Sequence, residues 1–81
     1  MLYINIYLRK DLNKRNGANF IQKVKDLKEI KLIRGNTVYN GQSFNGLLIG
    51  NFKEKEEITV AILEEDLENF KKIISEYGEV K

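Results

Sequence analysis

The sequence predicts one α+β domain over residues 1–81, an open-faced β-sandwich with a four-stranded antiparallel sheet and helices packed on one face. Two stretches alternate apolar and polar residues as half-buried strands do, and two others repeat apolar residues at helical spacing. A Gly-Asn pair between two short β-prone runs adds a hairpin. The expected element order is β-α-β-β-α-β-α.

The first strand spans residues 2–8, and a polar, basic loop follows over residues 9–17. A helix is expected over about residues 17–28, with Asn16 as its N-cap, because a short amide side chain can accept a hydrogen bond from the free amides of the first turn. The apolar stripe of this helix consists of Phe20, Ile21, Val24 and Leu27.

The middle of the chain is predicted to be a hairpin followed by a short helix. Residues 30–34 and 37–39 flank Gly35-Asn36, a turn in which glycine supplies a positive φ without steric cost. Ser43 is the expected N-cap of a helix within residues 40–50, and the three glycines there keep that helix short.

The last third predicts a strand over residues 57–63 and a C-terminal helix over residues 64–77 that ends at Gly78. Glu64, Glu65 and Asp66 form the only dense carboxylate cluster, and we interpret it as a solvated first helical turn. We therefore expect a protein that is not an enzyme.

The composition excludes several kinds of chemistry. There is no cysteine, so disulfides, thiol catalysis and thiolate metal sites are absent. There is no histidine, which removes the commonest metal ligand and the usual general base near neutral pH. No spacing suggests a metal site or a cofactor.

Residues 1–8 lack the features of a secretory signal, and no run approaches the roughly 20 apolar residues that span a bilayer, so a cytoplasmic protein is expected.

Charge is distributed unevenly along the chain. Residues 1–34 hold nine basic residues against three acidic ones, a net charge of +6, and the remainder holds five against nine, a net charge of −4. Such polarity suits an acidic partner, but solvated helix faces produce the same pattern.

The order of the expected elements and the positions of short motifs within them resemble the HPr family, the small phosphocarriers of the bacterial sugar phosphotransferase system. Residues 11–17, Asp-Leu-Asn-Lys-Arg-Asn-Gly, correspond to that family's Gly-(Ile/Leu)-His-Ala-Arg-Pro-Ala loop. Residues 40–46, Asn-Gly-Gln-Ser-Phe-Asn-Gly, correspond to its Asn-x-x-Ser-(Ile/Leu)-Met-Gly segment, and residues 57–59 repeat its Glu-Ile-Thr.

The resemblance implies that Asn13 stands where the family carries its phosphorylated histidine and that Arg15 matches the arginine that meets the phosphoryl oxygens. An amide nitrogen is a poor nucleophile, so phosphohistidine relay is not expected. Lys14, Arg15 and the amide of Gly17 are candidates for an anion site at the helix start. The alternative is a basic exposed loop with a capping asparagine.

By the same resemblance, Ser43 matches a serine that a dedicated kinase phosphorylates in some members. The alternative is that Ser43 serves only as the N-cap of the helix. The functional hypothesis is a regulatory or interaction protein of sugar uptake or carbon regulation with a protein partner and no membrane contact. The candidate partner-binding residues are Ala18, Asn19, Phe44, Asn45 and Leu48. The alternative is a small basic nucleic-acid-binding module, in which Tyr3, Tyr7 and Tyr39 stack bases on an open sheet face.

Overall fold

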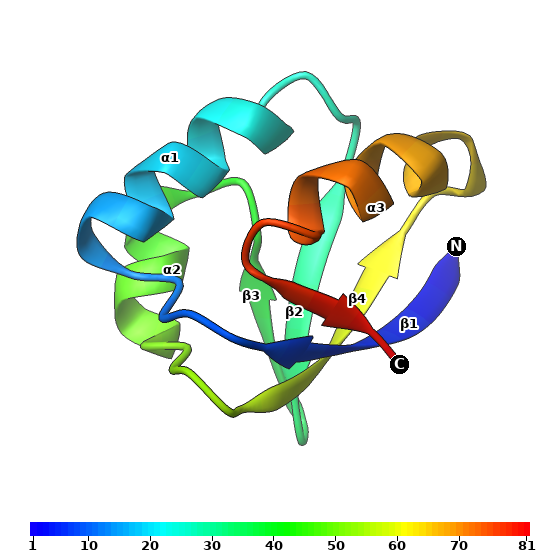
Figure 1. The fold of residues 1–81 in the computed structure, drawn as a ribbon. Coiled ribbons are helices and arrows are strands. Elements are labelled where there is room, and N and C mark those ends of the chain that lie inside the picture. The colour runs from blue at the N-terminus through cyan, green and yellow to red at the C-terminus, as the bar shows by residue number, and fades with distance from the viewer.

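A computed structural model describes all 81 residues. The elements follow the predicted order, with one strand added at the C-terminus (Figure 1). They are β1 (Leu2–Leu8), α1 (Lys14–Val24), β2 (Ile30–Arg34), β3 (Thr37–Asn40), α2 (Phe44–Gly50), β4 (Glu57–Ile62), a 3₁₀ turn (Glu64–Asp66), α3 (Leu67–Ile74) and β5 (Gly78–Val80).

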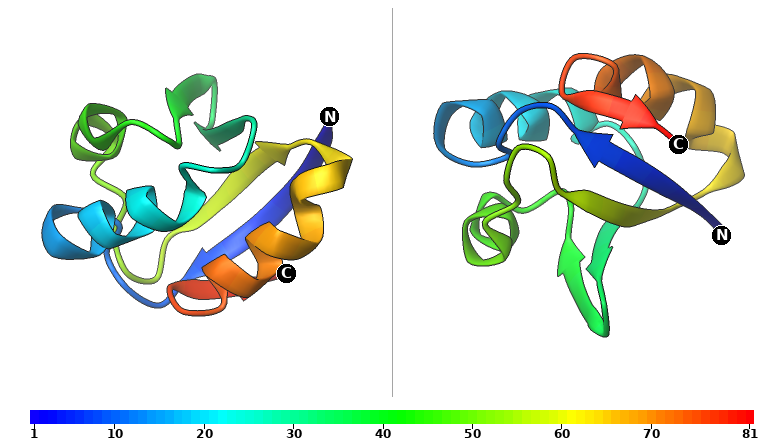
Figure 2. Two further views of the ribbon diagram at one scale, coloured as in Figure 1. Left: turned by 90° about the horizontal axis from the view of Figure 1, so that it is seen from above. Right: turned by 60° about the horizontal axis from the view of Figure 1, so that its bottom comes forward.

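The strands form one antiparallel sheet in the order β3-β2-β4-β1-β5. Ile6 pairs with Ile58 and Leu32 pairs with Val60, so the apolar residues of the central strands share one face. The helices pack on that face and leave the other open (Figure 2). The predicted fold class is confirmed.

The expected strand count of four is wrong, because β5 pairs with the second half of β1. Gly78 was expected to end the last helix, but α3 ends at Ile74 and Gly78 opens β5 opposite Leu8. A Cβ at Gly78 would overlap the carbonyl oxygen of Tyr7, so the close approach of β5 to β1 requires glycine there.

The first helix begins three residues earlier than expected. Its N-cap is Asn13 and not Asn16, since the Gly17 amide donates to the Asn13 carbonyl at 3.0 Å and draws residues 14–16 into the first turn. Lys14 has a φ of 50°, a left-handed conformation that costs a residue with a side chain about 1 kcal/mol. The chain therefore turns sharply into α1 directly after Asn13.

A single core lies between the helices and the sheet, and Phe20 of α1 is fully buried within it. Its ring packs edge-to-face on Phe70 of α3, with centroids 6.4 Å apart, and on Tyr77, at 5.5 Å. These aromatic contacts hold α1 and α3 together. The longest helix, α1, has 11 residues, and none of the helices has the length and hydrophobicity of a membrane span.

The Tyr77 hydroxyl is buried within this core and has no hydrogen-bond partner, although Lys23 and Glu76 lie beside the side chain. Burial raises the pKa of Tyr77. We expect Tyr77→Phe to leave stability unchanged or raise it by about 1 kcal/mol, because a buried polar group without a partner is destabilising. Chemical denaturation of both proteins measures this, and a clear loss of stability would mean that the hydroxyl has a partner.

Most ion pairs join a base from residues 1–34 to an acid from the rest of the chain. Arg9 pairs with Glu79 in β5, Lys23 pairs with Glu76 at 2.5 Å, and Lys28 pairs with Glu65 at 2.9 Å. Side-chain hydrogen bonding to Glu76 and to Glu65 raises the pKa of Lys23 and of Lys28, respectively. Much of the charge asymmetry is therefore neutralised within the fold, which leaves less of it for an acidic partner than the sequence suggested.

Candidate functional site

The loop ahead of α1 and the loop after α2 lie against each other and form the frame of the site. The amide of Leu12 donates to the Phe52 carbonyl at 2.9 Å, and the amide of Lys55 donates to the Leu8 carbonyl at 2.7 Å. The amide of Glu54 donates to the Asp11 carboxylate at 2.6 Å. Leu12 and Phe52 are fully buried beneath these contacts, so both loops are anchored to the core.

Asn13 lies where these loops meet the two helices. Its side-chain amide does not cap α1; it donates to the side-chain oxygen of Asn51 at 2.9 Å. Asn51 is the left-handed C-cap of α2, with a φ of 47° and its own amide bonded to the Leu47 carbonyl. The position that the resemblance equates with the phosphorylated histidine thus links the start of α1 to the end of α2.

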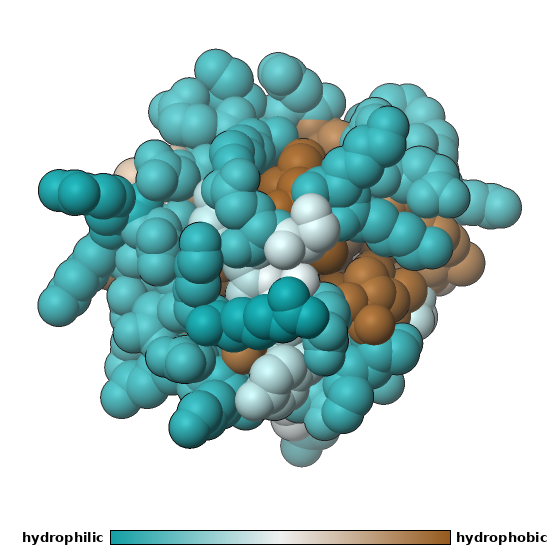
Figure 3. Space-filling model, in the orientation of Figure 1, coloured by the Kyte–Doolittle hydropathy of each residue, from teal (hydrophilic) through white to brown (hydrophobic).

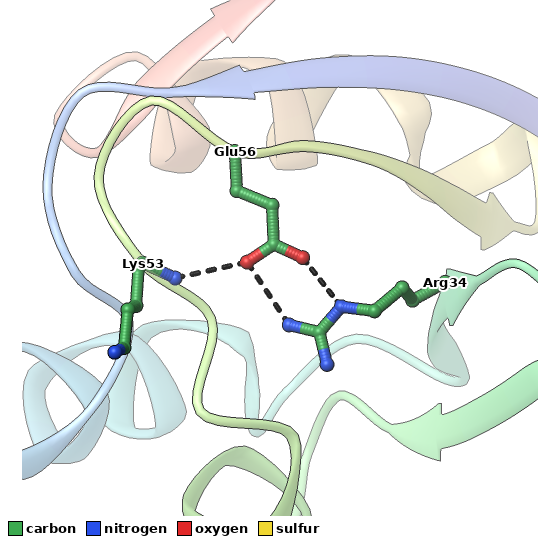
Figure 4. Close-up of polar contacts among 3 residues, drawn as sticks. All are labelled: Arg34, Lys53 and Glu56. Carbon is green, nitrogen blue, oxygen red and sulfur yellow. Dashed lines mark hydrogen bonds and ion pairs between the residues drawn. The ribbon is translucent and has the colours of Figure 1, made fainter.

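A charged clamp behind the second loop holds it to the sheet (Figure 4). The Arg34 guanidinium donates through Nε to one oxygen of Glu56 at 2.5 Å and through Nη2 to the other at 2.9 Å, and the Lys53 amide donates to the same carboxylate at 3.1 Å. Arg34 also stacks over Phe52, 4.7 Å from the ring centroid. A bidentate pair of this kind fixes geometry as well as charge.

The clamp changes the ionisation of both partners. Burial by itself raises the pKa of Glu56. Hydrogen bonds from Arg34 and from the Lys53 amide, together with the positive charges of the two side chains, outweigh burial and lower that pKa below its usual value. Hydrogen bonding to Glu56 raises the pKa of Arg34 in turn. Sequence reasoning missed this pair, because the two residues are 22 positions apart and no local pattern connects them.

The candidate anion site is only partly assembled. Lys14 and Arg15 are exposed in the first turn of α1 and make no ion pair, so both cations are available to a ligand. Gly17 is buried, and its amide is already bonded to the Asn13 carbonyl. The Gly17 amide is therefore already engaged within the helix, and Gly17 packs closely against the backbone of Leu12.

Ser43 is the N-cap of α2, as predicted, and its hydroxyl accepts a hydrogen bond from the Gly46 amide at 3.2 Å. The helix that follows is apolar on its outer side: Phe44 is 39% exposed, Leu48 45% and Ile49 77%. Leu47, in contrast, is fully buried. The sequence favoured Leu47 as the inward residue of this run, and the structure confirms it, but Ile49 was not predicted as a surface residue.

The candidate partner-binding residues lie on the outer sides of two packed helices. Ala18 and Asn19 are exposed on α1, Phe44, Asn45 and Leu48 are exposed on α2, and α1 contacts α2. We name the exposed apolar residues Phe44, Leu48 and Ile49 the α2 patch. A second apolar area appears in Figure 3 below α3, along the first half of β1. In these two elements, Leu2, Ile4, Leu67 and Ile73 are partly buried and pack against the core.

The three tyrosines proposed to stack bases do not share a face. Tyr3 is 67% exposed on the open face, and Tyr7 lies on that face too. Tyr39 pairs with Leu32 and packs edge-to-face on Phe52 at 5.1 Å, on the side that the helices cover. The predicted stacking surface is therefore wrong for Tyr39. No group of three carboxylates converges to hold a metal ion.

The structural class is an open-faced sandwich in which the loop ahead of α1 and the loop after α2 meet at one exposed edge. No protein-family model matches the chain, and no curated protein matches it by sequence. Solved structures do match. HPr-C-His from Thermoanaerobacter tengcongensis superposes with a TM-score of 0.79 at 19% identity, over 93% of this chain and 89% of that one.

Two further phosphocarriers match with slightly lower TM-scores. Phosphocarrier protein HPr from Bacillus anthracis str. Ames gives a TM-score of 0.75 at 18% identity, over 94% of this chain and 93% of that one. The histidine-containing phosphocarrier protein of a mycoplasma gives 0.75 at 15% identity, over 93% of each. The chain therefore has the fold of the HPr phosphocarriers, as the sequence resemblance predicted.

Proposed function

We propose that the chain is an HPr-like interaction protein of the cytoplasm that does not carry phosphohistidine. It binds a protein of the sugar phosphotransferase system or of carbon regulation through the start of α1 and the α2 patch. The observation that carries the proposal is the position of Asn13. In a chain without histidine, its amide occupies the junction of α1 and α2 and is held there by Asn51 at 2.9 Å.

The chemistry of Asn13 argues against phosphoryl transfer. The amide nitrogen has its lone pair delocalised into the carbonyl, so it is a poor nucleophile toward a phosphoryl donor. It also donates a hydrogen bond to Asn51, a role that fixes the side chain as part of the frame. A side-chain amide engaged in this contact suits a structural part of a binding surface better than a chemical relay.

The surroundings of Asn13 support a binding role. Exposed apolar side chains on a small domain are typical of interaction sites, and the α2 patch has three of them on one short helix. Lys14 and Arg15 add two unpaired cations at the start of the neighbouring helix. The expected partner surface is therefore apolar at its centre and acidic at its rim.

Ser43 is the proposed point of control. A phosphate on its oxygen would place negative charge at the start of α2, where the exposed backbone amides favour it. It would also lie directly beside Phe44 in the α2 patch. Phosphorylation is thus expected to change partner affinity with little change in the fold.

The nucleic-acid alternative has less support. Four of the nine basic residues in the first 34 are engaged with acids of the remainder, and the open face carries Tyr3 and Tyr7 without Tyr39. Binding that weakens steeply with added salt would favour this alternative over a protein partner.

The test is a phosphorylation assay with two donors. The chain is incubated with the general phosphotransferase of the sugar system and phosphoenolpyruvate, and separately with HPr kinase and ATP. We expect no label from phosphoenolpyruvate, and label from ATP that is lost in Ser43→Ala. The variant Asn13→His is expected to gain label from phosphoenolpyruvate, because it restores a nucleophilic nitrogen at the junction.

Each arm has an outcome that contradicts the proposal. Label on the unaltered chain from phosphoenolpyruvate would show that it relays phosphoryl groups by another residue. Failure of a correctly folded Asn13→His variant to accept label would show that Asn13 is not equivalent to the carrier histidine.

A further inference from the structure

Three Asn-Gly pairs occur in the chain, at Asn16-Gly17, Asn40-Gly41 and Asn45-Gly46. This dipeptide is the one most prone to spontaneous loss of the asparagine amide, because glycine presents an unhindered backbone nitrogen and a flexible backbone. The fold protects the three pairs to different degrees. We propose that Asn45 is a site of spontaneous deamidation and that the Ser43 hydroxyl controls its rate.

The reaction balances without an enzyme or a cofactor. The Gly46 backbone nitrogen loses its proton to solvent base and attacks Cγ of Asn45. The Cγ–Nδ2 bond breaks, the amide leaves as ammonia, and a five-membered succinimide forms. Water then opens either carbon–nitrogen bond of the ring to give aspartate or isoaspartate. The net change is one water consumed and one ammonia released.

Two of the pairs are protected by backbone bonds in buried surroundings. The Gly17 amide donates to the Asn13 carbonyl at 3.0 Å, and the Gly41 amide donates to the Ile30 carbonyl at 2.8 Å. Both glycines are buried. The Asn40 side chain is engaged as well, since its oxygen accepts from the Gln42 amide at 2.9 Å. Attack at these sites requires opening of the 11-residue helix α1 or of the sheet edge.

The third pair is held more weakly. The Gly46 amide donates to the side chain of Ser43 at 3.2 Å, the longest of the three contacts, and Asn45 is exposed. Its helix has seven residues, two of which are glycine, and each glycine disfavours helix relative to alanine. Local opening of α2 therefore costs least, and opening frees the Gly46 nitrogen to reach Asn45.

Deamidation would place a carboxylate beside Phe44 and Leu48, in the middle of the candidate partner surface. It would add negative charge two residues from Ser43 without any kinase. The chemistry itself depends only on the fold of α2, so it holds or fails independently of the proposed binding role.

The experiment is a time course of the full chain at mildly alkaline pH, followed by peptide mapping with mass spectrometry. We expect the peptide with Asn45 to convert first, to a mixture of aspartate and isoaspartate. In Ser43→Ala the conversion is expected to be about fivefold faster, the change in open population that loss of a typical N-cap produces. Ser43→Thr, which keeps a capping hydroxyl, is expected to convert at close to the original rate.

Asn45→Gln serves as the matched control, because its longer side chain cannot close the five-membered ring, and it should abolish the charge change at this position. Circular dichroism and denaturation of each variant show whether it remains folded. Conversion of Asn16 or Asn40 before Asn45 would overturn the proposed site. An unchanged rate in a folded Ser43→Ala variant would overturn the proposed control by Ser43.

Discussion

Phe20→Ala is expected to destabilise the protein by about 3–5 kcal/mol, the usual cost of removing a buried phenylalanine. The Phe20 side chain is fully buried and contacts Phe70 and Tyr77 edge-to-face, with centroids 6.4 and 5.5 Å apart. Alanine leaves a cavity at the contact of α1 with α3, and the surrounding core can close it only in part. Because domains have total stabilities of about 5–15 kcal/mol, such a loss is a large fraction of the whole. Denaturation by guanidinium chloride measures it.

Asn19→Ala is the control for this experiment, since Asn19 is the exposed neighbour of Phe20 on the same helix. Its cost is expected to stay within about 0.5 kcal/mol, as for most surface positions. A cost below about 1 kcal/mol for Phe20→Ala would mean that α1 does not pack on the core through this ring.

Glu56→Gln is expected to cost about 1–2 kcal/mol near neutral pH, because it removes the charge that Arg34 and the Lys53 amide bind. The lower end of the range reflects solvent screening, as the Arg34 side chain is 39% exposed. The loop of residues 51–56 should loosen with it. Faster hydrogen exchange at Leu12 and Phe52, measured by NMR, would report that loosening.

The loss of stability caused by Glu56→Gln should disappear in acid. The contacts with Arg34 and the Lys53 amide outweigh burial and lower the pKa of Glu56 below its usual value of 4.5. The contribution of the ionised Glu56 to stability is therefore present above that value and disappears as the pH falls through the lowered pKa. Denaturation across this acid range should therefore show the stabilities of the original and variant proteins converging. Glu54→Gln is the control, since the Glu54 side chain makes no ion pair. A constant difference at every pH would contradict a role for the charge.

Local periodicity predicted the regular elements well, because the apolar spacing of β1, β4, α1 and α3 depends on short stretches of sequence. The strand β5 escaped prediction because its three residues are too few to show a pattern, and only pairing with β1 defines it. The N-cap was misplaced from Asn13 to Asn16, since asparagine suits either position and only the bond from the Gly17 amide to the Asn13 carbonyl decides between them.

The candidate site was predicted only where its features have a local sequence signature. Ser43 was identified as a cap because capping has a local signature, and the structure bears it out. The contact of Asn13 with Asn51 and the clamp of Arg34 on Glu56 join residues 38 and 22 positions apart. Such pairs depend on the tertiary fold, and a single sequence does not reveal them.

The pairing of bases from one part of the chain with acids from the other has a consequence for how the molecule folds. β1 must find β4 and β5, fifty or more residues away, and closing so long a loop is slow. In the unfolded chain, the positive and negative segments attract each other before any side chain packs. Dissolved salt weakens that attraction. The refolding rate should therefore fall clearly at high ionic strength, although exposed ion pairs contribute little to the free energy of unfolding.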